Sequence, residues 1–209
     1  MHENSALEFY LILFFNYLLI SRMIPSNLSF SLPNADRIRE YKRCLEMNST
    51  ILKFNNQDYF KIKKECKEEG KLFLDDTFNT LESIRNIDEI KNYKIVWQRP
   101  FHITNEPKFR INESKGVVQG ILGNCWLVAA FASLVSQQKL WDKVVPNKNI
   151  QNFNHDDYCG IFMFRFWRFG FWIEVVVDDL LPTIDNKLAF AHSDSPNEFW
   201  CALCEKVNF

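Results

Sequence analysis

The stretch QGILGNCWLVAAFASLV, residues 119–135, decides how this chain folds. Its first part is a turn that contains Gly120 and Gly123, and its second part is apolar at nearly every position. A short helix that is apolar on nearly every side has to be buried. The stretch therefore predicts a tight turn followed by a buried helix that begins near Cys125.

Cys125 has the sequence setting of a nucleophile. A thiol attacks a carbonyl only as the thiolate, and an unperturbed pKa of about 8.5 leaves little thiolate at neutral pH. The N–H groups and dipole of a helix N-terminus favour negative charge and lower that pKa. Gln119 can turn its side-chain amide toward the same point and, with the Cys125 backbone N–H, stabilise the oxyanion of a tetrahedral intermediate. The alternative is that Cys125 is a small buried residue at a helix start.

Helix and strand patterns lie on both sides of this stretch. Residues 41–69 have a helical pattern, with Gly70 as the expected C-cap, and residues 71–118 have no regular pattern. Ile161–Trp167 and Phe171–Val177 are rich in aromatic and β-branched residues. These two segments predict a β-hairpin.

A last helix is expected near the C-terminus. Ser195 is expected as its N-cap, Pro196 as its first helical residue, and Glu198 as the residue that completes a capping box. The sequence stops at Phe209, about three turns into this helix. We therefore expect the chain to be a piece of a longer protein.

Charge and cysteine content exclude several classes of protein. The 209 residues carry 25 basic and 26 acidic side chains, for a net charge of -1. No overall field therefore favours nucleic acid or an anionic membrane. The 6 cysteines are too few and too irregularly spaced for a disulfide scaffold, which indicates reduced thiols in a cytosolic protein.

Two paired motifs suggest metal binding but have simpler interpretations. Cys201 and Cys204 have the spacing of half a zinc site, but no second pair exists, so we expect them to pack in a helix. Asp178 and Asp179 are adjacent at the end of a predicted strand, and adjacent strand residues point to opposite faces. We expect this acidic pair to form a turn.

Residues 1–40 are interpreted as an extension of uncertain status. An apolar run covers residues 7–20, interrupted only by Glu8 and Asn16. The run is shorter than the ~20 residues that a membrane-spanning helix needs. We favour an unstructured or artefactual extension and a cytoplasmic protein, with membrane association as the alternative if the run is real.

The motif at residues 119–126, Gln-Gly-x-x-Gly-x-Cys-Trp, resembles the nucleophile segment of papain-like peptidases. Its extension to Leu127 is similar to the version found in the calpain family, with Asn124 where an Asp is usual. The resemblance continues from about residue 55 to the end of the chain. It is carried by the hairpin segments Tyr158–Phe162, Phe166–Gly170 and Val175–Thr183, by 191–193 and 197–206 after them, and by 57–59, 70–73 and 97–100 before the motif.

The resemblance implies a calcium-dependent intracellular cysteine endopeptidase that acts on protein substrates, with Cys125 as nucleophile and Gln119 in the oxyanion hole. It implies a second lobe that supplies a histidine and an asparagine, and a possible regulatory subunit or inhibitor. In papain-like enzymes the histidine and asparagine lie roughly 130–150 residues beyond the cysteine, and this sequence ends before that point. Of the histidines present, none is expected to serve as the base.

The resemblance also implies a calcium site in this lobe. Its ligands are backbone carbonyls before the glutamine, an Asp three residues before it, and the Glu of an Asn-Glu-Phe-Trp string. That Glu is Glu198, but the Asp position holds Gly116, and whether Asn112 or Glu113 compensates stays open. Calcium takes six to eight oxygen ligands, several of them from carboxylates. We therefore expect weak or no calcium binding.

The sequence thus predicts an α+β fold: the first lobe of a papain-like cysteine protease, with helices and a β-hairpin, truncated before the second lobe. Its organisation is predicted as an extension at 1–40, a helical lead-in at 41–69, and an incomplete calpain-type protease subdomain at 70–209. The predicted function is calcium-dependent cysteine endopeptidase, with this chain inactive alone. The alternative is a non-catalytic calpain-like protein that binds substrates or partners.

Overall fold

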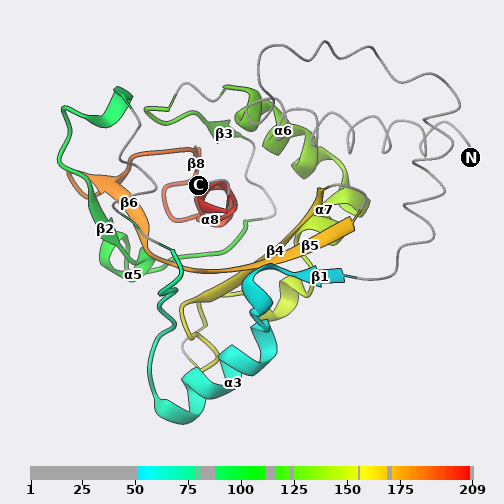
Figure 1. Ribbon diagram of the computed structural model, residues 1–209. Coiled ribbons are helices and arrows are strands. Elements are labelled where there is room, and N and C mark those ends of the chain that lie inside the picture. Colours follow the sequence, from blue (N-terminus) through cyan, green and yellow to red (C-terminus); the bar gives the residue numbers. More distant parts are fainter. Residues whose placement is uncertain are drawn as a thin grey trace, which may run out of the picture.

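A long antiparallel hairpin lies at the centre of the fold (Figure 1). The computed structural model describes residues 51–78, 80, 88–111, 116–122, 125–154, 156–168 and 171–207. Strand β4 (Ile161–Arg168) pairs with β5 (Phe171–Asp178), in register from Ile161 opposite Asp178 to Arg168 opposite Phe171. The predicted hairpin is confirmed, while the residues that join its strands lie outside the described ranges.

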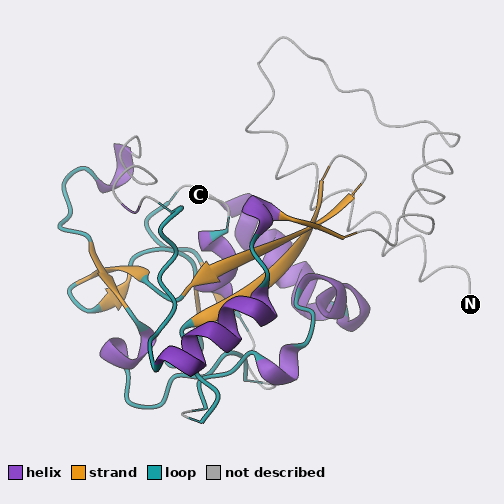
Figure 2. Cartoon of the chain, turned by 60° about the horizontal axis from the view of Figure 1, so that its bottom comes forward, coloured by secondary structure: helices purple, strands orange, loops and turns teal. Residues whose placement is uncertain are grey.

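The hairpin is buried on both faces, which explains why its strands are apolar at consecutive positions. Side chains alternate between the two faces of a strand. Ile161 and Met163 of β4 pack in one cluster with Tyr59, whereas Phe162 and Phe164 pack in the main core on the other side. Helices lie on both sides of the strands (Figure 2).

Helix α3 (Tyr59–Glu69) covers the first face. The Asp58 side chain caps it by accepting a hydrogen bond from the Lys61 N–H at 3.0 Å. The helix ends at Gly70, which has a φ of 62°. This left-handed conformation favours glycine. The predicted C-cap is confirmed.

Helices α6 (Cys125–Ser136), α7 (Gln138–Val144) and α8 (Trp200–Lys206) enclose the main core on the other face. The helix predicted from the apolar run is α6, and Gln137 separates it from α7. Aromatic rings join the helices, since the Trp200 ring lies 5.4 Å from the ring of Phe131 and 5.0 Å from that of Trp141. Every residue of α8 is buried.

Short strands complete the fold. Strand β1 (Ile51–Lys53) adds to the hairpin in parallel with β5, giving the order β1-β5-β4. Strands β2 (Val96–Gln98), β6 (Leu181–Ile184) and β7 (Lys187–Leu188) form a second sheet, and β3 (Val117–Val118) pairs with β8 (His192–Ser193). One short helix, α5 (Pro100–Ile103), and the 3₁₀ turns η1 (Phe54–Asn56), η2 (Asp88–Ile90) and η3 (Lys148–Ile150) lie between these elements.

Three sequence expectations need correction. The helical lead-in predicted for 41–69 contains β1 and η1 before its helix starts at Tyr59, and residues 41–50 lie outside the described ranges. Residues 71–118, predicted to be irregular, contain β2, α5 and β3. The last helix begins at Trp200, not at Pro196, so Ser195 is not its N-cap. In each case long-range backbone pairing overrides the local pattern.

Candidate functional site

Cys125 is the first residue of α6, as the sequence predicts, and its side chain is exposed. The helix is anchored behind it by Leu127, Ala130 and Phe131, which are buried in the core. The N–H groups of a first helical turn have no partner within the helix. The exposed Cys125 side chain therefore lies at the N-terminus of α6, the end of a helix that carries the positive end of its dipole.

Gln119 is exposed and follows β3 directly. Its Nε2 donates a hydrogen bond to the Leu122 carbonyl at 2.7 Å. The amide is thus held within the turn that leads to Cys125, whose residues Gly123 and Asn124 lie outside the described ranges. Catalytic hydrogen bonds are often not yet formed in an enzyme without substrate. An oxyanion role for Gln119 requires its amide to exchange the Leu122 carbonyl for the substrate oxygen.

Gly120, at the start of this turn, packs closely against the backbone of Phe190, just after β7. A Cβ atom at position 120 would overlap the backbone of Phe190. The neighbouring Ile121 N–H donates to the Ala189 carbonyl at 2.9 Å. Only glycine allows this approach, so the turn between Gln119 and Cys125 is positioned by the segment just after β7.

The two described histidines, His192 and His102, are not placed as a catalytic base for Cys125 by any contact in the described part of the chain. The His192 Nδ1 donates to the Phe190 carbonyl at 2.9 Å. His102 is exposed on α5, and His2 and His155 lie outside the described ranges. The contact of His192 gives it a structural role within the region that holds Gly120.

Glu198 is buried, with 1% of its surface exposed, and both of its carboxylate oxygens have donors. Oε1 accepts from the Ile111 N–H, and Oε2 accepts from the Ser193 hydroxyl. Its backbone forms a parallel bridge with Lys108. The expected capping box is therefore wrong, because Glu198 precedes α8 and its carboxylate joins segments far apart in the sequence.

Of the residues assigned to calcium, Glu198 and Gly116 lie in the described part of the chain. The Glu198 carboxylate faces N–H and O–H donors, and no group of three or more His, Cys, Asp or Glu side chains that could hold a metal occurs among the described residues. At Gly116 a Cβ atom would lie 3.4 Å from Oδ2 of the exposed Asp194. Asn112 and Glu113 lie outside the described ranges.

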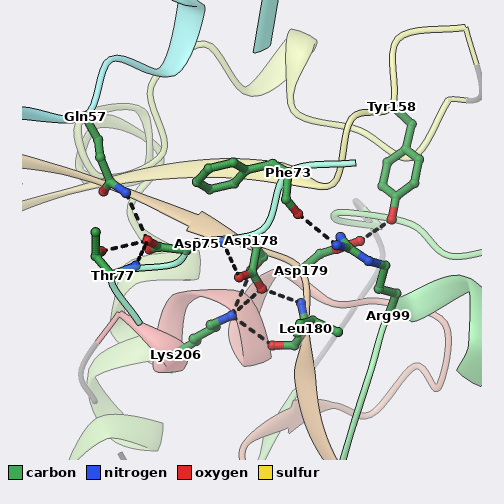
Figure 3. Close-up of polar contacts among 10 residues, drawn as sticks. All are labelled: Gln57, Phe73, Asp75, Thr77, Arg99, Tyr158, Asp178, Asp179, Leu180 and Lys206. Atoms are coloured by element: carbon green, nitrogen blue, oxygen red, sulfur yellow. Dashed lines mark hydrogen bonds and ion pairs between the residues drawn. The ribbon is translucent and has the colours of Figure 1, made fainter. Parts of the chain in front are cut away.

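A buried polar network next to α8 was not predicted from the sequence (Figure 3). Asp178 forms an ion pair with Lys206 at 2.5 Å, and each side chain is 1% exposed. Asp179 pairs with Arg99 and accepts from the Tyr158 hydroxyl. Burial raises the pKa of Asp179, while Tyr158 and Arg99 lower it. The two carboxylates thus have separate partners and do not form one metal site.

The described cysteines other than Cys125 are buried, so their thiols are not accessible to a substrate. Cys66, Cys159, Cys201 and Cys204 are buried and form no disulfide. Burial raises the pKa of each of these four thiols. Cys125 is therefore the exposed thiol of the described residues. Separately, no helix in these ranges is long and apolar enough to cross a bilayer.

A sequence profile described as "Calpain family cysteine protease" matches residues 73–208. The chain belongs to the calpain family.

Individual family members align with most of the chain. It is 41% identical to mouse (Mus musculus) calpain-5 over 166 residues, which cover 77% of this chain and 26% of that protein. It is 42% identical to the human (Homo sapiens) calpain-2 catalytic subunit over 177 residues, which cover 81% of this chain and 25% of the relative. Calpain-5 of Caenorhabditis elegans is 44% identical over 157 residues, 74% of this chain and 24% of its own length. The chain thus spans about a quarter of the length of these relatives.

Proposed function

We propose that this chain is the nucleophile-bearing lobe of an intracellular, calcium-dependent cysteine endopeptidase. Cys125 attacks the peptide carbonyl and forms an acyl-enzyme, and Gln119 and the Cys125 N–H bind the oxyanion. The observation that carries the proposal is the exposed Cys125 at the N-terminus of α6, a helix whose other face packs in the main core. Family membership supports it, because the relatives are calpains.

The remaining steps need groups from a second lobe. A histidine takes the thiol proton and later protonates the leaving amine, and an asparagine orients that histidine. Protein substrates bind between the two lobes. Four buried cysteines in the described ranges that form no disulfide favour a reducing compartment, so we place the protein in the cytoplasm. A regulatory subunit or inhibitor is a further partner that the family suggests.

The isolated chain is expected to hydrolyse no peptide, with or without calcium, because the base is proposed to come from the second lobe. The measurement is turnover of a fluorogenic peptide by the purified 209-residue chain. Fusing the chain to the part of the human calpain-2 catalytic subunit that follows the matched region is expected to give calcium-stimulated turnover. Sustained turnover by the isolated chain, abolished by Cys125→Ala, would refute the need for a second lobe. A folded fusion without activity would favour a non-catalytic binding protein.

Calcium is expected to bind this lobe weakly or not at all. Sensor sites bind calcium at about 10⁻⁷–10⁻⁵ M and depend on the number of charged ligands. Here the Glu198 carboxylate is occupied by donors and position 116 is glycine. We propose that the calcium dependence of the whole protein comes mainly from parts other than this site.

Calorimetric titration of the unmodified chain, Gly116→Asp and Gly116→Asn tests this expectation. Gly116→Asp places a second carboxylate beside Asp194, so it is expected to bind calcium and to gain thermal stability on calcium addition. Gly116→Asn adds a side chain of similar size without charge and is expected to gain neither. Tight binding by the unmodified chain, lost in Glu198→Gln, would contradict the prediction.

A further inference from the structure

A cavity of about 200 Å³ lies at the opposite end of α6 from Cys125. One of its lining residues, Ala132, is exposed on this helix. Most of its wall is apolar, and one charged side chain takes part. The lining includes Arg110, Gly116, Val117, Ala132, Val135 and Trp200. The cavity therefore lies between β3, α6 and α8.

Arg110 is the charged residue of the cavity lining, and its guanidinium carries hydrogen-bond donors. Its guanidinium stacks on the ring of Trp141, with Cζ 3.9 Å from the ring centroid. Among the described residues its side chain forms no hydrogen bond or ion pair within bonding distance. Stacking occupies the face of a guanidinium and leaves the N–H groups on its edge available. A partly buried arginine in this state is stabilised by an acceptor that reaches it through the cavity.

The carboxylates near Arg110 have other partners. Burial lowers the pKa of Arg110, while the charges of Glu198 and Asp142 raise it. Arginine side chains stay protonated in proteins. The Glu198 oxygens accept from the Ile111 N–H and the Ser193 hydroxyl. Asp142 accepts from Lys148 at 2.6 Å and from Gln138 at 2.8 Å. These carboxylates therefore leave the N–H groups of the half-buried Arg110 available to an acceptor that enters the cavity.

We propose that this cavity binds a carboxylate carried on a short branched apolar group, with Arg110 bonding the carboxylate and Val117 and Val135 contacting the apolar part. This binding site goes beyond the proposed protease function. Strand β3 ends just before Gln119, and α6 begins with Cys125. A ligand between these two elements contacts the supports of both proposed catalytic groups. The carboxylate that binds belongs either to a free small acid or to the C-terminal residue of a peptide.

The test uses the full 209-residue chain labelled with ¹⁵N. Backbone amide shifts of Val117 and Val135 are followed during titration with 3-methylbutanoate and with its neutral isostere 3-methylbutanamide. Saturable shifts are expected with the acid, and affinity for the amide is expected to be lower by about tenfold or more, since hydrogen bonds to charged groups are the stronger ones. Acetate, which has the charge without the apolar part, is expected to bind more weakly than 3-methylbutanoate. Tighter binding of N-acetyl-leucine than of 3-methylbutanoate would identify a peptide C-terminus, and the reverse a free acid.

Two variants distinguish the contribution of the Arg110 charge to binding from that of the cavity volume. Arg110→Gln is expected to remove the preference for acid over amide. Ala132→Leu enlarges a side chain of the cavity lining and is expected to remove binding of both probes. Its matched control, Ala129→Leu, changes an exposed alanine on the same helix outside the cavity lining and is expected to bind as the unmodified chain does. Equal affinity of the unmodified chain for acid and amide, or no saturable shift with either, would overturn the proposal even if Arg110→Gln did not fold.

Discussion

Replacing Lys206 by methionine is expected to lower the free energy of unfolding by about 3–5 kcal/mol. The Lys206 Nζ lies 2.5 Å from Asp178 Oδ1, 3.0 Å from the Leu180 carbonyl and 3.2 Å from the Asp178 carbonyl. The rings of Phe78 and Trp97 lie beside it, with centroids at 4.6 Å and 5.7 Å. Methionine fills similar space but leaves a buried carboxylate without its counter-charge. A loss of this size is a large share of the stability of an ordinary domain.

Chemical denaturation of the variant chain measures the effect, and two further variants locate its cause. Lys143→Met changes an exposed lysine on α7 and is expected to alter stability by no more than about 0.5 kcal/mol. Adding Asp178→Asn to Lys206→Met removes the unpaired charge, so the double variant is expected to recover part of the loss. A loss below about 1 kcal/mol in Lys206→Met would show that the pair does not hold α8 in place.

Local sequence signals predicted the elements that carry the proposed nucleophile. Two glycines before an apolar run predicted that α6 starts at Cys125, because a glycine-bounded turn and an apolar helix depend only on neighbouring residues. The expected burial on nearly every side is wrong, since Ala129 and Ala132 are exposed and only one face of α6 packs in the core. The consecutive apolar positions of β4 and β5 predicted the hairpin in the same way. Gly70 ended α3 because its left-handed conformation is a property of one residue.

The start of α8 was predicted incorrectly because long-range contacts decide it. The segment after Ser195 has the local pattern of a capping box. In the structure, Glu198 instead bridges to Lys108 and accepts from Ile111 and Ser193. Because of these contacts the backbone before Trp200 is not helical, and α8 begins at Trp200. A partner almost ninety residues away in the chain is not visible in a local pattern.

The adjacent carboxylates at the end of β5 were only partly anticipated. The expected turn is present, since Asp178 accepts from the Leu180 N–H at 2.8 Å. Their burial and their ion pairs with Lys206 and Arg99 were not predicted. Charge pairing of this kind depends on which elements pack together, and sequence spacing does not determine that.

The Gln119 side chain shows a similar limit at the proposed site. The spacing of Gln119 and Cys125 predicted a shared turn, and β3 and α6 flank that turn. The bond from Gln119 to the Leu122 carbonyl was not predicted. The sequence identifies which groups are available, whereas the hydrogen bond that the amide makes before substrate binds depends on the fold of the turn.

Within the fusion described above, Cys125→Ala is expected to lower kcat/KM by at least about 10⁴-fold, since the sulfur forms the covalent intermediate. Gln119→Ala is expected to lower kcat by about 10²–10³-fold with little change in KM, because an oxyanion donor acts mainly in the transition state. Cys66→Ala changes a buried thiol in the cluster beneath α3 and is expected to leave kcat nearly unchanged. The pattern across these variants distinguishes nucleophile, oxyanion donor and structural thiol.

The kcat/KM of the Cys125→Ala fusion for a fluorogenic peptide, measured with calcium and compared with that of the parent fusion, tests the central claim most directly. Circular dichroism of both proteins establishes that the variant folds as the parent does. The account predicts turnover by the parent and none above background by the folded variant. A folded Cys125→Ala fusion that retains a tenth or more of the parent activity would contradict the assignment of Cys125 as the nucleophile.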